Sequence, residues 1–278
     1  MSKNKLINLK ELINFSISIA QESGKLLEKL FRKEEAIIRG TSKEIKTFYD
    51  QLTDEIIKKR IEKKFRDHSY LTEETGLVDK NSDYLWIIDP LDGTGNFVNH
   101  NPFFSVSIAL WYKNQPLLGV IEAPILRERF IAIKSKGAYH YDLNKKIEKK
   151  IAKLSSINIL ENSYVIYCEG SEKNKKRILK IFKNIYPYVK EVRKLGSAAL
   201  ELAWIALGRA EIYYTTQISL WDIAAGLIFV KEAGAEIYKF NGQKYDWSDF
   251  PNNLLGKFDL IVSKPDLSKG FISLISKI

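Results

Sequence analysis

The chain has 278 residues, 45% of them apolar, which is enough for a sizeable core and argues against intrinsic disorder. The formal net charge of +10 favours anionic ligands, but the lysines are scattered over polar faces, so nucleic-acid binding is not expected. The single cysteine, Cys168, excludes an internal disulfide and cysteine-cluster zinc sites, and no apolar run approaches the ~18 residues of a membrane span, so we expect a cytoplasmic protein.

The first half of the chain predicts two helices followed by a sheet. Apolar residues recur at helical spacing from Leu9 to Arg32 and again from about Asp50 to Phe65. Short apolar runs bounded by turn residues then predict strands at Tyr84 to Ile88, Phe104 to Leu110, Leu117 to Glu122 and Arg129 to Ile133, and a hairpin over Gly137 to Lys150. We place a domain boundary near residue 150.

The second half alternates between strand and helix patterns. The predicted strands are Tyr164 to Cys168, Val189 to Arg193, Glu211 to Tyr214 and Phe258 to Val262. The predicted helices are Lys173 to Tyr186, Ser197 to Leu207 and Ile223 to Glu232. Residues 1–150 are therefore expected to form an N-terminal α+β part, and residues 151–278 a C-terminal α/β part.

The segment from Trp86 to Phe97 carries the strongest chemical signal. An apolar strand ends there in the run Asp89-Pro90-Leu91-Asp92-Gly93-Thr94. Two carboxylates three residues apart in a turn can share one pocket, where the Leu91 carbonyl adds an oxygen ligand suited to Mg²⁺. The small residues that follow leave backbone N–H groups free to approach a phosphate. From the residues alone, a plain turn whose carboxylates cap the backbone explains the segment equally well.

Other acidic positions are ambiguous when each is taken alone. Glu73 and Glu74 precede the same strand, and either of them can reach the pocket or remain an exposed charge. Asp222 stands ahead of an apolar helix, in a position typical of an N-cap. Asp50 and Asp54 lie at one-turn spacing near the start of the second helix, as ordinary surface residues do.

The order and spacing of these clusters resemble the inositol monophosphatase-like family, with its inositol monophosphatase, archaeal fructose-1,6-bisphosphatase and bisphosphate nucleotidase branches. The resemblance covers nearly the whole chain. One family signature corresponds to Asp89 to Phe97 with Pro102 to Phe104, and a second to Trp221 to Gly226 with Glu232 to Gly234. The resemblance implies a layered αβαβα sandwich of the sugar-phosphatase type, in the α+β or α/β class.

The same resemblance implies a role for particular residues. The metal ligands, for two or three Mg²⁺ per site, would be Glu73, Asp89, Asp92, Asp222 and the Leu91 carbonyl. The catalytic residues that activate water would be Asp50, Glu73 and Thr94. The substrate-binding residues would be Asp92, Gly93, Thr94, Gly196, Ser197, Ala198, Thr215 and Asp222. Residues 1–150 would thus carry most metal ligands, and residues 151–278 would complete the site.

The activity implied is that of a Mg²⁺-dependent phosphomonoesterase, expected to be a homodimer, which hydrolyses inositol monophosphate or a sugar phosphate such as fructose 1,6-bisphosphate. The alternatives are an adenosine 3′,5′-bisphosphate 3′-nucleotidase and, from another class, a non-catalytic anion- or RNA-binding protein. Thr215 stands where inositol phosphatases commonly have a glutamate, so we expect a less selective alcohol pocket. Thr47 and Asp50 retain only the frame of the motif for a third metal.

Overall fold

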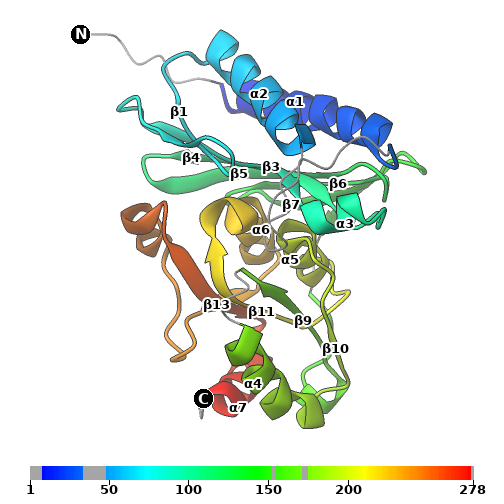
Figure 1. The fold of residues 1–278 in the computed structure, drawn as a ribbon. Coiled ribbons are helices and arrows are strands. Elements are labelled where there is room, and N and C mark those ends of the chain that lie inside the picture. The colour runs from blue at the N-terminus through cyan, green and yellow to red at the C-terminus, as the bar shows by residue number, and fades with distance from the viewer. Residues whose placement is uncertain (1–7, 34–47, 152–153, 171–174, 277–278) are drawn as a thin grey trace.

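The computed structural model describes residues 8–33, 48–151, 154–170 and 175–276. Helices and sheets alternate in five layers, from a helical pair at one end to a second pair at the other (Figure 1). The predicted layered αβαβα sandwich is confirmed. Thr47 and the first two residues of the helix predicted from Lys173 lie outside the described residues.

Two helices, α1 (Leu9–Leu30) and α2 (Phe48–Lys64), form the first layer. Side chains at helical spacing on α1, among them Leu12, Phe15 and Ile19, are buried toward the neighbouring sheet because they share one face of the helix. Both helices agree with the predicted positions to within two residues.

The first sheet has eight strands in the order β2-β1-β3-β4-β5-β6-β7-β8. The strands are β1 (Ser69–Thr72), β2 (Gly76–Val78), β3 (Tyr84–Asp92), β4 (Ser105–Tyr112), β5 (Gln115–Ala123), β6 (Glu128–Ile133), β7 (Gly137–Asp142) and β8 (Ile147–Ile151). β1 and β3 are parallel, and the other neighbours are antiparallel. The short strands β1 and β2 were not predicted from the sequence.

Strand β4 shows why the strands of this sheet read as continuous apolar runs. Val106, Ile108 and Leu110 belong to the core shared with α1 and α2, whereas Ala109 and Trp111 belong to the core on the opposite face. Because successive side chains of a strand point to opposite faces, a sheet covered on both sides favours apolar residues on both faces of its strands.

The second sheet has five strands in the order β10-β9-β11-β13-β12. The strands are β9 (Tyr164–Glu169), β10 (Glu191–Arg193), β11 (Ile212–Ser219), β12 (Glu236–Tyr238) and β13 (Lys257–Ser263). The helices α5 (Ala198–Ala206) and α6 (Leu220–Glu232) lie between the two sheets, and α4 (Lys175–Ile185) and α7 (Pro265–Ile275) cover the outer face of the second sheet (Figure 1). β12 and α7 were not predicted.

Small residues allow α6 to lie close to its neighbours. A Cβ added at Gly119 of β5 would come within 3.0 Å of the Ala225 backbone, and one at Gly226 within 2.6 Å of Leu202 on α5. The Ala-Ala-Gly run after Asp222 is therefore explained by packing between the two sheets. This close packing fixes the start of α6 relative to β3.

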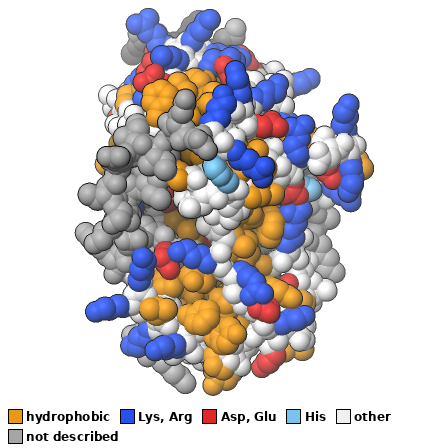
Figure 2. Space-filling model, turned by 45° about the vertical axis from the view of Figure 1, so that its right-hand side comes forward, with side chains coloured by type: hydrophobic (Ala, Val, Ile, Leu, Met, Phe, Trp, Pro, Cys, Tyr) orange, Lys and Arg blue, Asp and Glu red, His pale blue; other side chains and the backbone are white. Residues whose placement is uncertain are grey.

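The first sheet ends at Ile151 and the second begins at Tyr164. The division into residues 1–150 and 151–278 as domains stays a prediction. Within the part of the chain that the structure describes, none of the helices combines the length and apolar character needed to cross a bilayer. Lys and Arg side chains are spread over the face drawn in Figure 2, among hydrophobic and uncharged ones.

Candidate active site

Asp89 and Asp92 lie at the end of β3, where the strand leaves its regular pairing. The register with β4 shifts between these two residues, which creates an irregularity at the Asp-Pro-Leu-Asp run. Asp89 is 2% exposed and Asp92 6% exposed. The Leu91 N–H donates to Asp89 Oδ1 at 3.0 Å. The two carboxylates are thus held inside the protein at the edge of the sheet.

Three carboxylates from three different elements converge at this point. Oxygens of Glu73, Asp89 and Asp222 all lie within 4.8 Å of one another, and we call this group the acidic corner. Glu73 reaches it because β1 runs parallel to β3, with Thr72 beside Ile88, so the residue after the end of β1 comes next to Asp89 of β3. Of the two glutamates, the structure places Glu73 in the group, which is the one that the family resemblance implied.

Asp222 is the third residue of α6 rather than the residue ahead of the helix, so its predicted N-cap position is corrected. The helix begins earlier, and Ser219 takes the N-cap position. The Ser219 N–H donates to Asp222 Oδ2 at 3.1 Å, which turns the carboxylate back toward the start of the helix. This arrangement directs Asp222 toward the end of β3.

The acidic corner is electrostatically unfavourable as it stands. Burial and the charges of Glu73, Asp92 and Asp222 raise the pKa of Asp89 well above its ordinary value. Burial and the charge of Asp92 raise the pKa of Asp222 to about 7. A hard divalent cation neutralises buried carboxylates that repel one another, and it prefers oxygen ligands. The residues of the acidic corner therefore fit Mg²⁺.

Asp92 lies beside this group but has other partners. Its carboxylate accepts hydrogen bonds from the Ser197 hydroxyl at 2.5 Å and from the N–H groups of Ala198 and Ala199 at 3.0 and 2.9 Å. Burial raises the pKa of Asp92 to about 6, although these hydrogen bonds lower it. Asp92 therefore ties the end of β3 to the start of α5, and its role as a metal ligand stays a prediction.

Thr94 and Asp50 are brought together although 44 positions separate them. The Thr94 hydroxyl donates to Asp50 Oδ1 at 2.8 Å and lies 3.1 Å from the Leu91 carbonyl oxygen. Asp50 comes from α2 and is 2% exposed. The pairing places a hydroxyl and a carboxylate beside the Leu91 carbonyl, and the water-activating roles of Thr94 and Asp50 stay predictions.

The turn after Asp92 touches the loop before α5. Gly93 has a φ of +97°, and a Cβ there would lie 3.0 Å from the Gly196 carbonyl oxygen. A side chain at position 93 would therefore separate the two segments and strain the backbone. Gly196, Ser197 and Ala198, all predicted to bind substrate, thus lie against the predicted phosphate turn.

Comparison with known proteins identifies the family of this chain. The model of the inositol monophosphatase family matches residues 8–278. The chain belongs to the inositol monophosphatase family. It is 35% identical to the fructose-1,6-bisphosphatase/inositol-1-monophosphatase of Thermotoga maritima, over 84% of this chain and 86% of that protein. It is 33% identical to the Nus factor SuhB of Pasteurella multocida, over 83% and 86%.

Solved structures of the inositol monophosphatase family show the same fold. The Thermotoga maritima IMPase aligns with a TM-score of 0.81 and 30% identity, covering 96% of this chain and 97% of that one. The extragenic suppressor protein suhB of Bartonella henselae aligns with a TM-score of 0.83 and 26% identity, covering 96% and 99%. The prediction that this chain is a phosphoric monoester hydrolase is confirmed by its family.

Thr215 lies inside the second sheet, and its predicted contact with the substrate alcohol stays a prediction. The side chain is 0% exposed, and its hydroxyl donates to the Cys168 carbonyl oxygen on the adjacent strand β9 at 2.9 Å. The hydroxyl hydrogen of Thr215 is thus used within the second sheet.

Sequence reasoning missed two residues that support the site. Asn96 donates its amide hydrogens to the carbonyl oxygens of Phe103 at 2.6 Å and Leu195 at 2.7 Å, and so joins two loops. Glu201 accepts from the backbone just before α5. Asn96 belongs to the first family signature, and Glu201 follows Ser197 by one helical turn. The sequence could therefore have indicated that both residues lie near the site.

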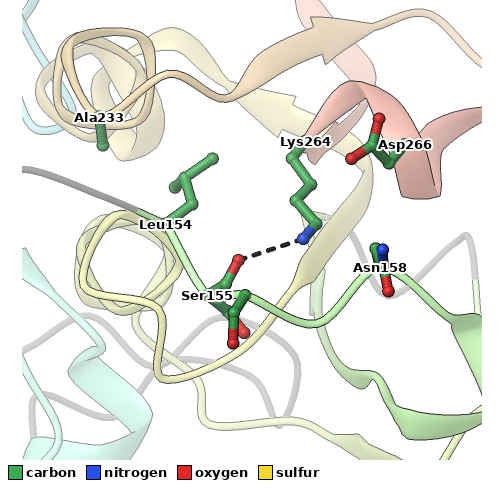
Figure 3. Close-up of a pocket in the computed structure, with 7 residues that line it drawn as sticks. Leu154, Ser155, Asn158, Ala233, Lys264 and Asp266 are labelled. Atoms are coloured by element: carbon green, nitrogen blue, oxygen red, sulfur yellow. Dashed lines mark hydrogen bonds between the residues drawn. The ribbon is translucent and has the colours of Figure 1, made fainter.

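A separate hollow of about 370 Å³ lies near the start of α7 (Figure 3). Ser155, Asn158, Lys264 and Asp266 are among its lining residues, and the Lys264 amino group donates to the Ser155 carbonyl oxygen at 3.1 Å. None of the predicted site residues lines this hollow. It is therefore distinct from the candidate active site.

Proposed function

We propose that this protein is a Mg²⁺-dependent phosphomonoesterase that hydrolyses a small phosphorylated metabolite, either inositol monophosphate or a sugar phosphate such as fructose 1,6-bisphosphate. The observation that carries the proposal is the acidic corner, where three carboxylates from separate elements meet within 4.8 Å. The Thermotoga maritima relative supports this substrate range, since its name combines both activities.

The residues around the acidic corner have the chemistry to hold two or three Mg²⁺. Glu73, Asp89 and Asp222 would be joined by Asp92 and the Leu91 carbonyl, all hard oxygen donors. Bound Mg²⁺ would neutralise charge on the phosphate and lower the pKa of a water molecule.

The chain's own part in the reaction is to orient water and to hold the phosphate. Because Thr94 uses its hydroxyl hydrogen on Asp50, its oxygen still has a lone pair that can accept a hydrogen bond from the attacking water. Asp50 is then placed to take up the proton as the water attacks phosphorus. The N–H groups of Gly93 and Thr94 open the helix α3 (Thr94–Val98), and such groups have no partner within a helix, so they suit the phosphate oxygens.

Two alternatives stay open. The enzyme alternative is the adenosine 3′,5′-bisphosphate 3′-nucleotidase, which uses the same metal chemistry on a larger alcohol. The other is a non-catalytic anion- or RNA-binding protein, and the relatives named Nus factor SuhB are the reason to keep it under test. We also propose a homodimer in the cytoplasm, on the family resemblance and the single cysteine.

Phosphate release decides among these functions. The purified protein is incubated with inositol monophosphate, fructose 1,6-bisphosphate and adenosine 3′,5′-bisphosphate, each with Mg²⁺ and with EDTA. We expect turnover with Mg²⁺ only, and fastest with one of the first two substrates. Preference for the nucleotide would support the first alternative, and no turnover of any substrate with Mg²⁺ would support the non-catalytic one.

A further inference from the structure

Glu201 is a buried carboxyl group close to the candidate active site. It lies on the first turn of α5 and is 0% exposed. Its Oε1 accepts hydrogen bonds from the backbone N–H groups of Leu195 at 3.0 Å and Gly196 at 2.8 Å. Within the described residues its Oε2, also buried, has no hydrogen-bond partner. Burial of a carboxyl group is unfavourable, so its position calls for a compensating role.

The two N–H groups that Glu201 holds belong to the loop from Leu195 to Ala198. The same loop is fastened from the other side, because Asn96 donates to the Leu195 carbonyl oxygen and Asp92 accepts from the Ala198 N–H. Glu201 therefore holds the loop through its backbone N–H groups. Asn96 and Asp92 hold it through other backbone atoms.

The position of this loop determines the space beside the phosphate turn. The Gly196 carbonyl oxygen lies so close to Gly93 that a Cβ at Gly93 would come within 3.0 Å of it. Thr215 is buried and donates its hydroxyl hydrogen to the Cys168 carbonyl oxygen, so the loop beside Gly93 is the candidate surface for the alcohol portion of a substrate. A displacement of about 1 Å in such a contact changes rates or affinities by up to 100-fold.

We propose that Glu201 is a positioning residue that sets the affinity of the site for the alcohol portion of its substrate by holding the loop from Leu195 to Ala198. This inference rests on the proposed phosphatase function. Glu201 acts through the loop and touches neither the substrate nor the reacting atoms. Burial raises the pKa of Glu201 to about 8, so near neutral pH its uncharged form predominates, which a glutamine imitates in shape and in acceptor oxygen.

The kinetic test compares Glu201→Ala with Glu201→Gln and with a matched control, Glu232→Ala. Glu232 also accepts two backbone N–H groups, those of Ser135 at 2.7 Å and Gly137 at 2.8 Å, but it lies ten residues beyond Asp222 on α6, about 15 Å along the helix. KM and kcat are measured with the fastest substrate of the panel and with 4-nitrophenyl phosphate, which has no polyol hydroxyls.

We expect Glu201→Ala to raise KM for the panel substrate roughly 10-fold or more, with a much smaller change for 4-nitrophenyl phosphate. Glu201→Gln should restore the wild-type KM, and Glu232→Ala should leave both KM values unchanged. If Glu201→Ala only lowers kcat in proportion to the folded fraction, or raises both KM values equally, Glu201 has a purely structural role and the proposal is wrong.

Hydrogen–deuterium exchange gives a readout that does not depend on activity. In Glu201→Ala the amides of residues 194–200 should exchange faster than in the wild type, whereas in Glu232→Ala the faster exchange should occur at residues 135–137. Unchanged protection of the loop in Glu201→Ala would overturn the proposal. A wild type that releases no phosphate would instead refute the proposed function, and the exchange result would still decide whether Glu201 holds the loop.

Discussion

Two acidic sites in this molecule are largely removed from solvent, but their neighbours differ. In the acidic corner, carboxylates lie within 4.8 Å of one another. On the outer strands of the first sheet, Glu128 instead lies 3.0 Å from His140 Nε2 and accepts from Arg209 at 2.5 and 3.0 Å. One group collects like charges, and the other pairs opposite ones.

The pKa shifts of the two groups have opposite signs. His140 and Arg209 lower the pKa of Glu128 to about 2 although burial opposes them, so the ionised form supports folding. In the acidic corner burial and like charges raise the pKa values, so the ionised form opposes folding. A bound cation would relieve such repulsion, so we expect the acidic corner to be functional and the Glu128 group to be structural.

Asp89→Asn should give the largest effect on phosphate release and the clearest contrast between activity and stability. Phosphate release should fall on the order of 1000-fold, because a charged ligand is lost at constant volume. The free energy of unfolding without metal should be unchanged or raised at pH 7, since one of the repelling charges is gone. Phosphate release and urea unfolding measure the two effects, and wild-type turnover in a Mg²⁺-saturated sample would refute the assignment.

Thr215→Glu extends the comparison by adding an unpaired acid to a buried position. We expect the free energy of unfolding to fall by about 3 kcal/mol or more, since the new carboxylate would lack a partner. Thr215→Val is the matched control and should retain the wild-type KM, because the hydroxyl it removes is used within the second sheet, where it donates to the Cys168 carbonyl oxygen and interacts with the Tyr213 side chain. A stable Thr215→Glu protein that gains selectivity for inositol monophosphate would instead restore the predicted substrate contact.

Thr94→Ala tests the water-orienting pair beside the acidic corner. We expect kcat to fall roughly 10- to 100-fold with little change in KM, since the hydroxyl acts on water rather than on bound phosphate. Steady-state kinetics at saturating Mg²⁺ measure both constants. A change in KM alone would contradict the proposed role, and Thr94→Ser, which keeps the hydroxyl, should retain most of the activity.

Glu128→Gln should have the smallest effect, and it should affect only stability. At this partly exposed site we expect a loss of roughly 1 kcal/mol at pH 7, after solvent screening, with unchanged kcat/KM. Because the folded pKa is lowered from 4.5 to about 2, the ionised form stabilises the fold above pH 4.5, and this stability is lost as pH falls toward 2. Between pH 4.5 and 2, the free energy of unfolding measured in urea should fall less steeply in the variant than in the wild type. An equally steep fall would contradict the pairing of Glu128 with His140 and Arg209.

Local patterns in the sequence were sufficient for most of the regular elements, although the helix α7 was missed. The apolar spacing of α1 and the runs of β3 to β6 lie close to their predicted positions, because helix and strand periodicity is a property of neighbouring residues. β1 and β12 were missed because each has only three or four residues, too few for a period to show. The turn at Asp89 to Thr94 and the two family signatures were likewise readable, since their meaning lies in contiguous residues.

The sequence by itself determined the family, the layered fold and the carboxylates that are candidates for metal binding. The family resemblance already pointed to Glu73 rather than Glu74, and the tertiary structure gives the physical reason, because the parallel register of β1 on β3 brings Glu73 next to Asp89. Only the tertiary structure showed that Thr215 is buried and that Glu201 holds the loop before α5. These features depend on burial and on contacts between elements distant in the chain, which local periodicity does not encode.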